Sequence, residues 1–306
     1  MMDVITSFLA SDIRTAMPIL IAALGLVFSE RAGIVNIGTE GFMLIGALFG
    51  VLGSYWTGSV VLGAILAMVV TMIFSWIFAF FTITIRADQT VVGTAVNIFA
   101  SGLTITLNRV TFGLSTSVPK IDVYDAVPIP LLSKIPVLGP ALFSQSIPVY
   151  ITMIAVPIAW FVLMKTNIGL KIRAVGEHPR ACDTVGINVK ATRYRAVLFS
   201  GLMTGFAGAF VSMGQLSFFT EGMVSGRGFM ALAAVVFGNY TPGGALVAAL
   251  LFGAGDALSY RLQASNTGIP YQFLTMLPYL ITVVAICTMI RKSNKPAASA
   301  VPYTKE

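Results

Sequence analysis

The segment Ser29–Leu44, SERAGIVNIGTEGFML, places ionisable and amide side chains between two apolar stretches. Glu30 and Arg31 are adjacent, and we expect them at a membrane interface, where such a pair stays solvated. Asn36 and Glu40 lie beyond them and enter the next apolar stretch. A charged group inside a membrane is costly, so these two side chains are the first candidates for a functional role.

Two interpretations of Asn36 and Glu40 remain open. Either they cap the start of a helix near the cytoplasmic face, or they lie on a pathway through the membrane. Glycines in the same segment permit a bend or an unwound stretch, whose backbone groups must be buried in protein or line a wet cavity. These glycines are Gly33, Gly38 and Gly41.

Further candidates lie in other apolar stretches. Asn97 either bonds across helices or lies on the same pathway. Asp256 is a carboxylate within a later stretch, and Phe42 and Phe229 are aromatic candidates for stacking on a substrate. Aromatic residues at helical spacing are also typical of core or lipid-facing positions. The apolar stretches show no paired His–Glu, Ser–His or clustered carboxylates, which disfavours an intramembrane enzyme.

Membrane helices must position these residues. The chain has 306 residues, of which 57% are hydrophobic and 10% charged, against about 25% charged in soluble domains. About 20 apolar residues cross a bilayer as a helix. The sequence therefore predicts an all-α, polytopic membrane protein with about nine spans. The expected spans are Ile13–Phe28, Ile34–Tyr55, Ser59–Phe81, Val91–Val110, Ile147–Met164, Tyr194–Met213, Gly228–Gly238, Gly244–Tyr260 and Gln272–Ile290.

Basic residues orient these spans, because they concentrate between Lys165 and Arg195 and again after Ile290. The positive-inside rule places both clusters in the cytoplasm, with the N-terminus outside and the C-terminus inside. The tail, 291–306, is then cytoplasmic. Loop 112–146 is external, and its prolines favour short extended pieces over a spanning helix. It is either a packed lid or a docking rim. Neither basic cluster is interleaved with aromatics, so nucleic acid is not an expected partner.

An internal repeat and two glycine motifs indicate how the spans pack. GFMLIGALFGVLG from Gly41 is echoed by GFMALAAVVFGNY from Gly228. The two copies run in opposite directions on this orientation, which is typical of transporters with two inverted-topology repeats. The second copy is short and predicts a broken or half-penetrating helix. The small residues expected to bring helices together are Gly46, Gly50, Gly201, Gly205 and Gly208.

The loop RAVGEHPRACDTVGINV predicts a short helix at about Pro179–Val185, with proline in its first turn and Gly186 at its end. Thr192 is expected to cap the helix that follows. By pattern alone the loop is either an amphipathic surface segment or a lever held by a partner. His178 is the single histidine, and no metal site is expected around it.

This loop resembles that of ABC-importer permeases of the branched-chain amino acid, ribose and nucleoside type, whose pattern is R-A-x-G-x-x-x-x-A-x-x-x-G-I. GFMALAAVVFGNYTPGGALVAALLFGA is similar to a second region of that family, and SERAGIVNIGTEGFMLIGA to its nucleoside branch. The resemblance covers about Ala16 to Ile290. Cys182 and Asp183 depart from the pattern, in which small residues are common.

The resemblance implies a single permease domain, 1–306, that moves nucleosides, guanosine or other purines among them, inward by alternating access. Segment 173–190 would be the cytoplasmic coupling-helix loop that docks on an ABC ATPase. The residues implied in this coupling are Arg173, Ala174, Gly176, Glu177, His178, Pro179, Ala181, Gly186 and Ile187.

The implied partners are the ATPase, a second and longer permease subunit, and an extracellular or periplasmic substrate-binding lipoprotein, all at a bacterial plasma (inner) membrane. No cofactor is expected in this chain. Since the sequence has no GxxxxGK[ST] loop, ATP–Mg would be bound by the ATPase. Two alternatives stay open. One is a simple-sugar (ribose-type) permease; the other is an ion-coupled secondary transporter that uses Glu40 or Asp256 as a proton carrier.

Overall fold

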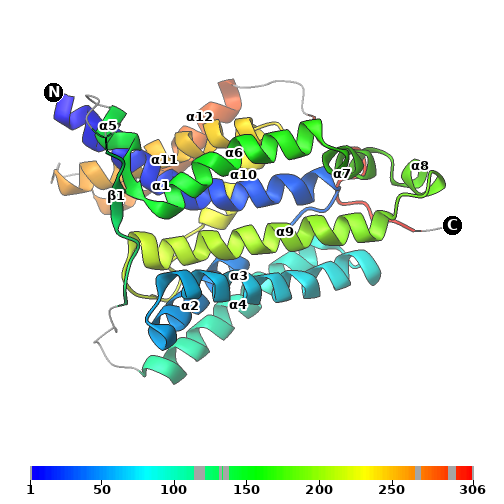
Figure 1. The fold of residues 1–306 in the computed structure, drawn as a ribbon, viewed down its shortest axis with the longest axis horizontal. Coiled ribbons are helices and arrows are strands. Elements are labelled where there is room, and N and C mark those ends of the chain that lie inside the picture. The colour runs from blue at the N-terminus through cyan, green and yellow to red at the C-terminus, as the bar shows by residue number, and fades with distance from the viewer. Residues whose placement is uncertain are drawn as a thin grey trace.

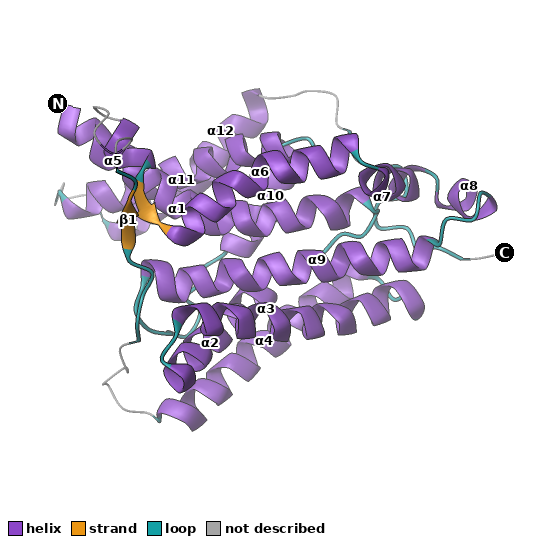
Figure 2. Cartoon of the chain, in the orientation of Figure 1, coloured by secondary structure: helices purple, strands orange, loops and turns teal. Residues whose placement is uncertain are grey.

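The computed structural model describes residues 2–113, 121–130, 133, 138–265, 270–288 and 294–304, so parts of the expected external loop and of the tail lie outside the described residues. The chain is mostly helical (Figures 1 and 2). The elements are α1 (Met2–Arg31), α2 (Thr39–Thr57), α3 (Val60–Ala79), η1 (Phe80–Thr84), α4 (Gln89–Phe112), β1 (Ala126–Pro128), α5 (Leu138–Leu142), β2 (Ser144–Ser146), α6 (Ile147–Lys165), α7 (Asn167–Glu177), α8 (Pro179–Thr184), α9 (Val189–Phe210), η3 (Val211–Gln215), α10 (Arg227–Phe237), α11 (Pro242–Ala264) and α12 (Tyr271–Thr288).

Six helices of the described chain are long and apolar enough to cross a bilayer. They are α1, α3 with η1, α4, α6, α9 with η3, and α11. The prediction of an all-α, multi-pass membrane protein is therefore supported. Helix α10 has 11 residues, which is too short for a span, and α2 and α12 are not among the six. The total of about nine spans remains a prediction.

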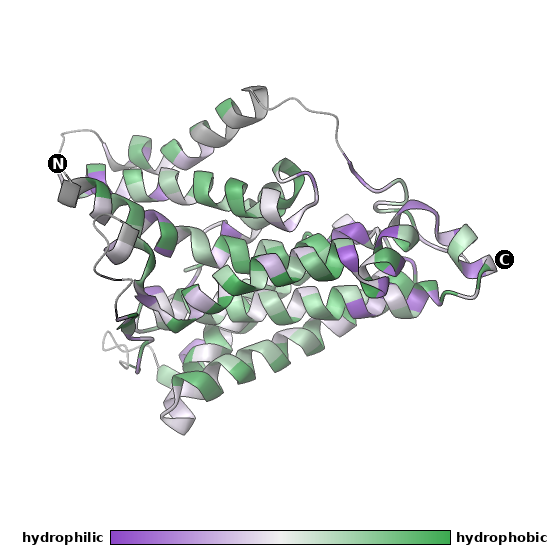
Figure 3. Ribbon diagram, turned by 45° about the horizontal axis from the view of Figure 1, so that its top comes forward, coloured by the Kyte–Doolittle hydropathy of each residue, from purple (hydrophilic) through white to green (hydrophobic). Residues whose placement is uncertain are grey.

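Helices α1 and α9 form the centre of the bundle. Helix α1 packs against α9, α10 and α11, and α9 also packs against α2 and α3. In their most apolar stretches 89% of α1 and 72% of α9 is buried, against 17% of α4 and 28% of α3. Helices α3 and α4 therefore present apolar side chains outward, as lipid-facing helices do. Apolar residues dominate the long helices, and polar ones gather at the end that carries α8 (Figure 3).

Glycines make the central contacts very close. Gly46 of α2 lies against the backbone of Gly205 in α9, and Gly208 lies against Met43. Gly201 of α9 faces Ser75 of α3, so the same helix has small residues towards two neighbours. Without a large hydrophobic driving force between helices in lipid, such close backbone contact is a main source of association.

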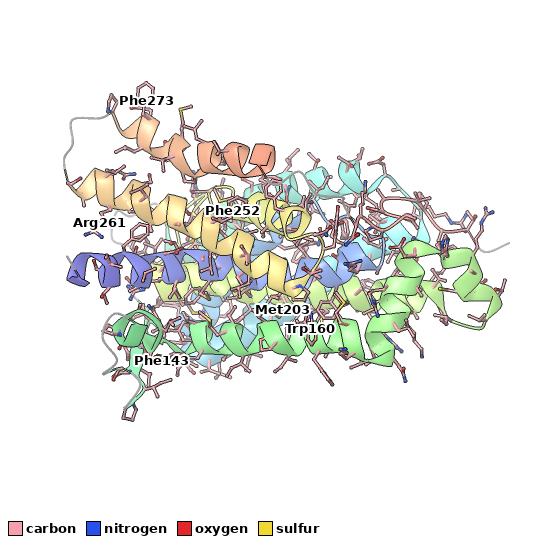
Figure 4. All side chains as sticks on the ribbon, turned by 90° about the horizontal axis from the view of Figure 1, so that it is seen from above. Phe143, Trp160, Met203, Phe252, Arg261 and Phe273 are labelled. Carbon is pink, nitrogen blue, oxygen red and sulfur yellow. The ribbon has the colours of Figure 1, made fainter. Side chains whose placement is uncertain are left out.

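The described parts of the loop before α6 are short pieces. Strands β1 and β2 pair antiparallel with Ala126 opposite Ser146. The hydroxyl of Tyr150 donates to the carbonyl of Val127 at 3.0 Å and so ties the strands to α6. The expectation of short extended segments is confirmed for these residues. This loop lies at the end of the molecule opposite α8, where Figure 4 labels Phe143.

Candidate functional site

Helix α2 starts only at Thr39, because the chain between Ala32 and Gly38 is not helical. Two amides of α4 bond to this unwound linker. Gln89 accepts a hydrogen bond from the backbone N–H of Val35 at 2.8 Å. Asn97 accepts from the N–H of Gly41 at 2.8 Å and donates to the carbonyl of Ile37 at 3.0 Å. These bonds satisfy backbone groups that would otherwise be unpaired within a membrane.

Glu40 joins the start of α2 to the start of α10. Its Oε1 accepts from the N–H of Gly226 and its Oε2 from the N–H of Gly228, both at 2.8 Å. The carboxylate thus lies at the positive N-terminus of α10 and satisfies two of its free donors. Gly228 lies so close to the backbone of Glu40 that a side chain there would collide with it. Glu40 therefore caps another helix rather than its own, whose N-cap, Gly38, makes no side-chain cap bond.

The two helices run in opposite directions from this junction. Helix α2 leads towards the end of α9, where Gly50 contacts Ala209. Helix α10 leads towards Arg31, whose Nε donates to the carbonyl of Tyr240 at 2.8 Å. With 11 residues, α10 is about 16 Å long. That is about half the hydrocarbon thickness of a bilayer.

A cavity of about 810 Å³ opens beside the junction, between the first half of α1, the segment before α10, α11 and α12. Arg227, the first residue of α10, contributes to its wall and donates through Nη2 to the hydroxyl of Tyr260 at 3.1 Å. The charge of Asp256 interacts with that of Arg227. The other polar lining includes Arg14, Gln215 and Gln263. The cavity therefore offers a ligand arginine and glutamine hydrogen-bond donors and the rings of two tyrosines, Tyr260 and Tyr279.

The expectation that Glu30 and Arg31 stay solvated is wrong. Glu30 is 2% exposed and Arg31 is 9% exposed. The tertiary structure buries the pair, because the α10–α11 turn and the C-terminal tail cover the end of α1. Arg31 bonds to the carbonyl of Tyr240 in that turn, and the charge of Glu30 interacts with that of Lys295 in the tail.

The short helix of the basic loop is confirmed within one residue, as α8 covers Pro179–Thr184. It projects from the rest of the molecule at the end that also carries the C-terminus (Figure 1). Gly186 ends it with a φ of +83°, the left-handed conformation that favours glycine. The expected cap by Thr192 is wrong, because Asn188 accepts from the N–H of Ala191 and caps α9 instead. The exposed residues of this loop are His178, Arg180, Ala181, Thr184, Val185, Gly186, Asn188 and Lys190.

The C-terminal tail, described from 294 to 304, connects this loop to the unwound linker before α2 and to the α10–α11 turn. The N–H of Ala298 donates to the carbonyl of Gly176 at 2.8 Å, and the N–H of Ala300 donates to that of Gly33 at 3.1 Å. The N–H of Asn294 donates to Oδ1 of Asn239 in the α10–α11 turn at 2.7 Å. The tail thus touches α7, the segment before α2 and the turn after α10.

Two buried side chains complete this contact. Arg193 is 1% exposed and donates to the carbonyls of Ala32 and Val301, both at 3.1 Å. Tyr303 packs in an apolar cluster with Val175, Cys182 and Val189. Burial raises the pKa of the Cys182 thiol, so the thiol stays protonated and unreactive at neutral pH.

The five expected pathway residues have different surroundings. Glu40 and Asn97 meet at the junction through Gly41. Asn36 is fully buried, and its side-chain amide has no partner among the described residues. Phe42 is fully buried against Phe78, whereas Phe229 is 48% exposed. The structure therefore does not bring the two phenylalanines together.

The sequence reasoning missed Gln89, Arg193 and Arg227. A signal for Arg227 was present, since the repeat aligns T-E-G-F-M at 39–43 with G-R-G-F-M at 226–230. Arg227 thus occupies the position equivalent to Glu40 with the opposite charge. Gln89 and Arg193 had no such signal, because their partners are backbone groups far away in sequence.

Comparison with known proteins gives a consistent match. The chain matches the family model described as branched-chain amino acid transport system / permease component over residues 8–289. It is 42% identical to the guanosine ABC transporter permease protein NupQ of Bacillus subtilis, over 95% of this chain and 94% of that protein. It is 37% identical to the nucleoside ABC transporter permease protein NupC of Lactococcus lactis, over 94% and 93%. The putative glucose ABC transporter permease protein TsgC13 of Haloferax volcanii is 32% identical, over 100% and 99%. No solved structure matches the chain.

Proposed function

Because the chain belongs to the family of branched-chain amino acid transport permease components, we propose that it is the membrane-spanning subunit of an ATP-driven importer of nucleosides. One observation carries the substrate assignment. The relatives named for guanosine and nucleoside transport match at 42% and 37% identity over more than nine-tenths of this chain. The chain itself transfers no chemical group.

The proposed topology has about nine spans, the N-terminus outside, the C-terminus inside and two inverted repeats. The opposite directions of α2 and α10 support it, because both repeats begin with a charged residue followed by Gly-Phe-Met at one junction. The described basic residues Lys171, Arg173, Arg180 and Lys190 lie at the α8 end, which is therefore cytoplasmic.

The proposed mechanism is alternating access driven from α8. A separate ABC ATPase binds ATP–Mg and holds the exposed face of α8. When the ATPase pair closes, α8 and α7 move, and the tail transmits this motion to Gly33 and Asn239. Gly33 precedes α2 and Asn239 follows α10, and Glu40 holds the starts of these two helices together. The junction and the cavity beside it then open to one side of the membrane at a time.

The other partners follow from the same assignment. A second, longer permease subunit would pair with this chain, and an extracellular or periplasmic lipoprotein would deliver substrate. The outward apolar faces of α3 and α4 leave room for such a pairing within the bilayer. The complex would lie in a bacterial plasma membrane.

A sugar importer is the second candidate, because the relative named for glucose matches over the whole chain at 32% identity. Reconstitution of the chain with its ATPase, second permease and lipoprotein in proteoliposomes separates the two. Guanosine uptake that requires ATP supports the proposal. Glucose uptake in its place supports the sugar permease, and uptake by this chain alone with a proton gradient contradicts both.

Coupling through α8 is tested separately by Gly186→Val, because valine strains a left-handed position. The position is exposed, with open space around it, so folding should survive. We expect ATP hydrolysis to persist while uptake falls at least tenfold. An unchanged ratio of uptake to hydrolysis would remove α8 from the coupling path.

A further inference from the structure

A groove of about 670 Å³ runs along the outside of the bundle between α6, α7 and α9, with α1 as its floor. Leu24 and Phe28 form the floor and are nearly or fully buried. The walls are apolar and exposed, with Ile154 and Ile158 on α6 at 60% and 56% exposure. On the α9 side the wall includes Phe199, which packs edge-on against Phe28 with ring centroids 4.8 Å apart, and Met203 (labelled in Figure 4).

The groove is polar at one end only. Lys171 of α7 and Thr192 and Arg195 of α9 line it there, next to the basic loop. Both basic side chains are exposed. In the part of the chain that the structure describes, neither is paired with a carboxylate. A long apolar slot that ends in two free cations matches a molecule with an apolar chain and an anionic head.

Helix α7 places this end at the membrane surface. It is seen nearly end-on in Figure 1, while α6 and α9 run across the view, so it lies across the ends of the spans. Thr166 separates it from α6 with an extended backbone and caps its start by accepting from the N–H of Gly169. Its Ile168 and Leu170 are 64% and 57% exposed beside Lys171. An amphipathic helix of this kind lies in the interface plane with its apolar side chains in the acyl region.

The head group must supply the selectivity. An acyl chain gains little by leaving surrounding lipid for a protein groove, because both are equally apolar. Near a membrane surface, a basic side chain binds an anionic head group more tightly than a neutral one. Two such side chains together correspond to a difference of about 30-fold in affinity. The groove should therefore select lipids by the charge of the head group and not by the acyl chain alone.

We propose that this groove binds one anionic phospholipid of the cytoplasmic leaflet. Its phosphate lies at Lys171 and Arg195, and an acyl chain follows the groove between α6 and α9 over the floor of α1. Because α7 continues directly into α8, the lipid contacts the segment that positions the coupling helix. Occupancy then raises the coupling between ATP hydrolysis and uptake, whereas binding itself does not depend on the transported substrate.

Native mass spectrometry of the purified importer tests this with phosphatidylglycerol and phosphatidylcholine as the lipids. We expect one retained phosphatidylglycerol per copy of this chain, and about 30-fold weaker retention in the double variant Lys171→Ala/Arg195→Ala. Lys190→Ala is the matched control, since Lys190 is basic and exposed on α9 but does not line the groove. Equal retention in the double variant and the control would overturn the proposal.

A second variant tests the chain-binding part without altering a charge. Ala159→Trp introduces a large side chain into the groove from α6, where Ala159 is 8% exposed. We expect it to lower phosphatidylglycerol retention and to remove the stimulation of uptake by this lipid in nanodiscs. Unchanged retention would contradict the placement of the chain. Cross-linking of Phe199→Cys to a helix of the second permease, with no lipid retained, would assign the groove to that subunit instead.

Discussion

The starts of α2 and α10 carry the same Gly-Phe-Met sequence but differ in nearly every structural respect. Helix α2 has 19 residues and α10 has 11. Phe42 is fully buried in α2, whereas the equivalent Phe229 in α10 is 48% exposed. Glu40 before the first copy bonds to the other helix, and Arg227 at the second bonds to Tyr260 beside the cavity.

This difference shows how one local pattern serves two roles. In both copies glycine permits a close approach of backbone at the helix start. The first copy is held within the bundle by α4 and α9, and so forms a fixed side of the junction. The second copy has an exposed face and one wall on a cavity. We therefore expect the α10 side to move and the α2 side to remain in place.

The largest difference between the copies should appear on removal of the phenylalanines. Phe42→Ala leaves a cavity against Phe78 and should lower the free energy of unfolding by about 3–5 kcal/mol. Phe229→Ala removes an exposed ring and should change it by about 0.5 kcal/mol. Unfolding in mixed micelles measures both. Equal losses would mean that the two helix starts are packed alike in the membrane.

Removal of the Glu40 carboxylate should have the second-largest effect on stability. Glu40→Ala leaves two N–H groups at the start of α10 without acceptors. We expect the free energy of unfolding to fall by about 3 kcal/mol and most of the uptake to be lost. Glu40→Gln keeps one acceptor oxygen, so its stability and its uptake should fall less. The control is Glu221→Ala, which removes an exposed ion pair with Arg109 and should be nearly neutral. Wild-type uptake in Glu40→Ala would show that the contact between the starts of α2 and α10 is not needed for transport.

A smaller effect is expected at the linker before α2. Asn97→Leu removes one hydrogen bond to this linker and one to the first turn of α2, and should destabilise the protein by about 1–2 kcal/mol. Asn108→Leu on the same helix, outside the junction, is the matched control. Thermal unfolding in detergent compares them. If both variants unfold alike, α4 does not hold the start of α2.

The smallest change in stability should accompany Arg227→Ala. The residue is half-buried and bonds to Tyr260, so we expect the free energy of unfolding to fall by about 0.5–1 kcal/mol. The Michaelis constant for uptake should nevertheless rise several-fold, because the cavity loses its cation opposite Asp256. Arg261→Ala, at the end of α11 in Figure 4, controls for lost surface charge. An unchanged Michaelis constant would remove the cavity from the substrate path.

Many local features were predictable within about two residues, although α1 begins at Met2 instead of Ile13 and α2 at Thr39 instead of Ile34. The apolar stretches indicated where the membrane helices lie, and Pro179 with Gly186 bounded the short helix α8. The glycines of α2 and α9 were expected at close contacts, and the structure places Gly46 against Gly205. In each case the information lies within a few neighbouring residues, since helix length, capping and helix-surface spacing are local properties.

The sequence alone thus determined the membrane class, most helix boundaries and the basic end of the molecule. It did not determine that Glu40 caps a helix 186 to 188 residues away, that Arg31 is covered by the α10–α11 turn, or that Tyr303 is buried behind α8. These arrangements satisfy buried charges and backbone groups through partners distant in the chain. Local composition carries no record of which partner is nearest, so only the packed tertiary structure decides it.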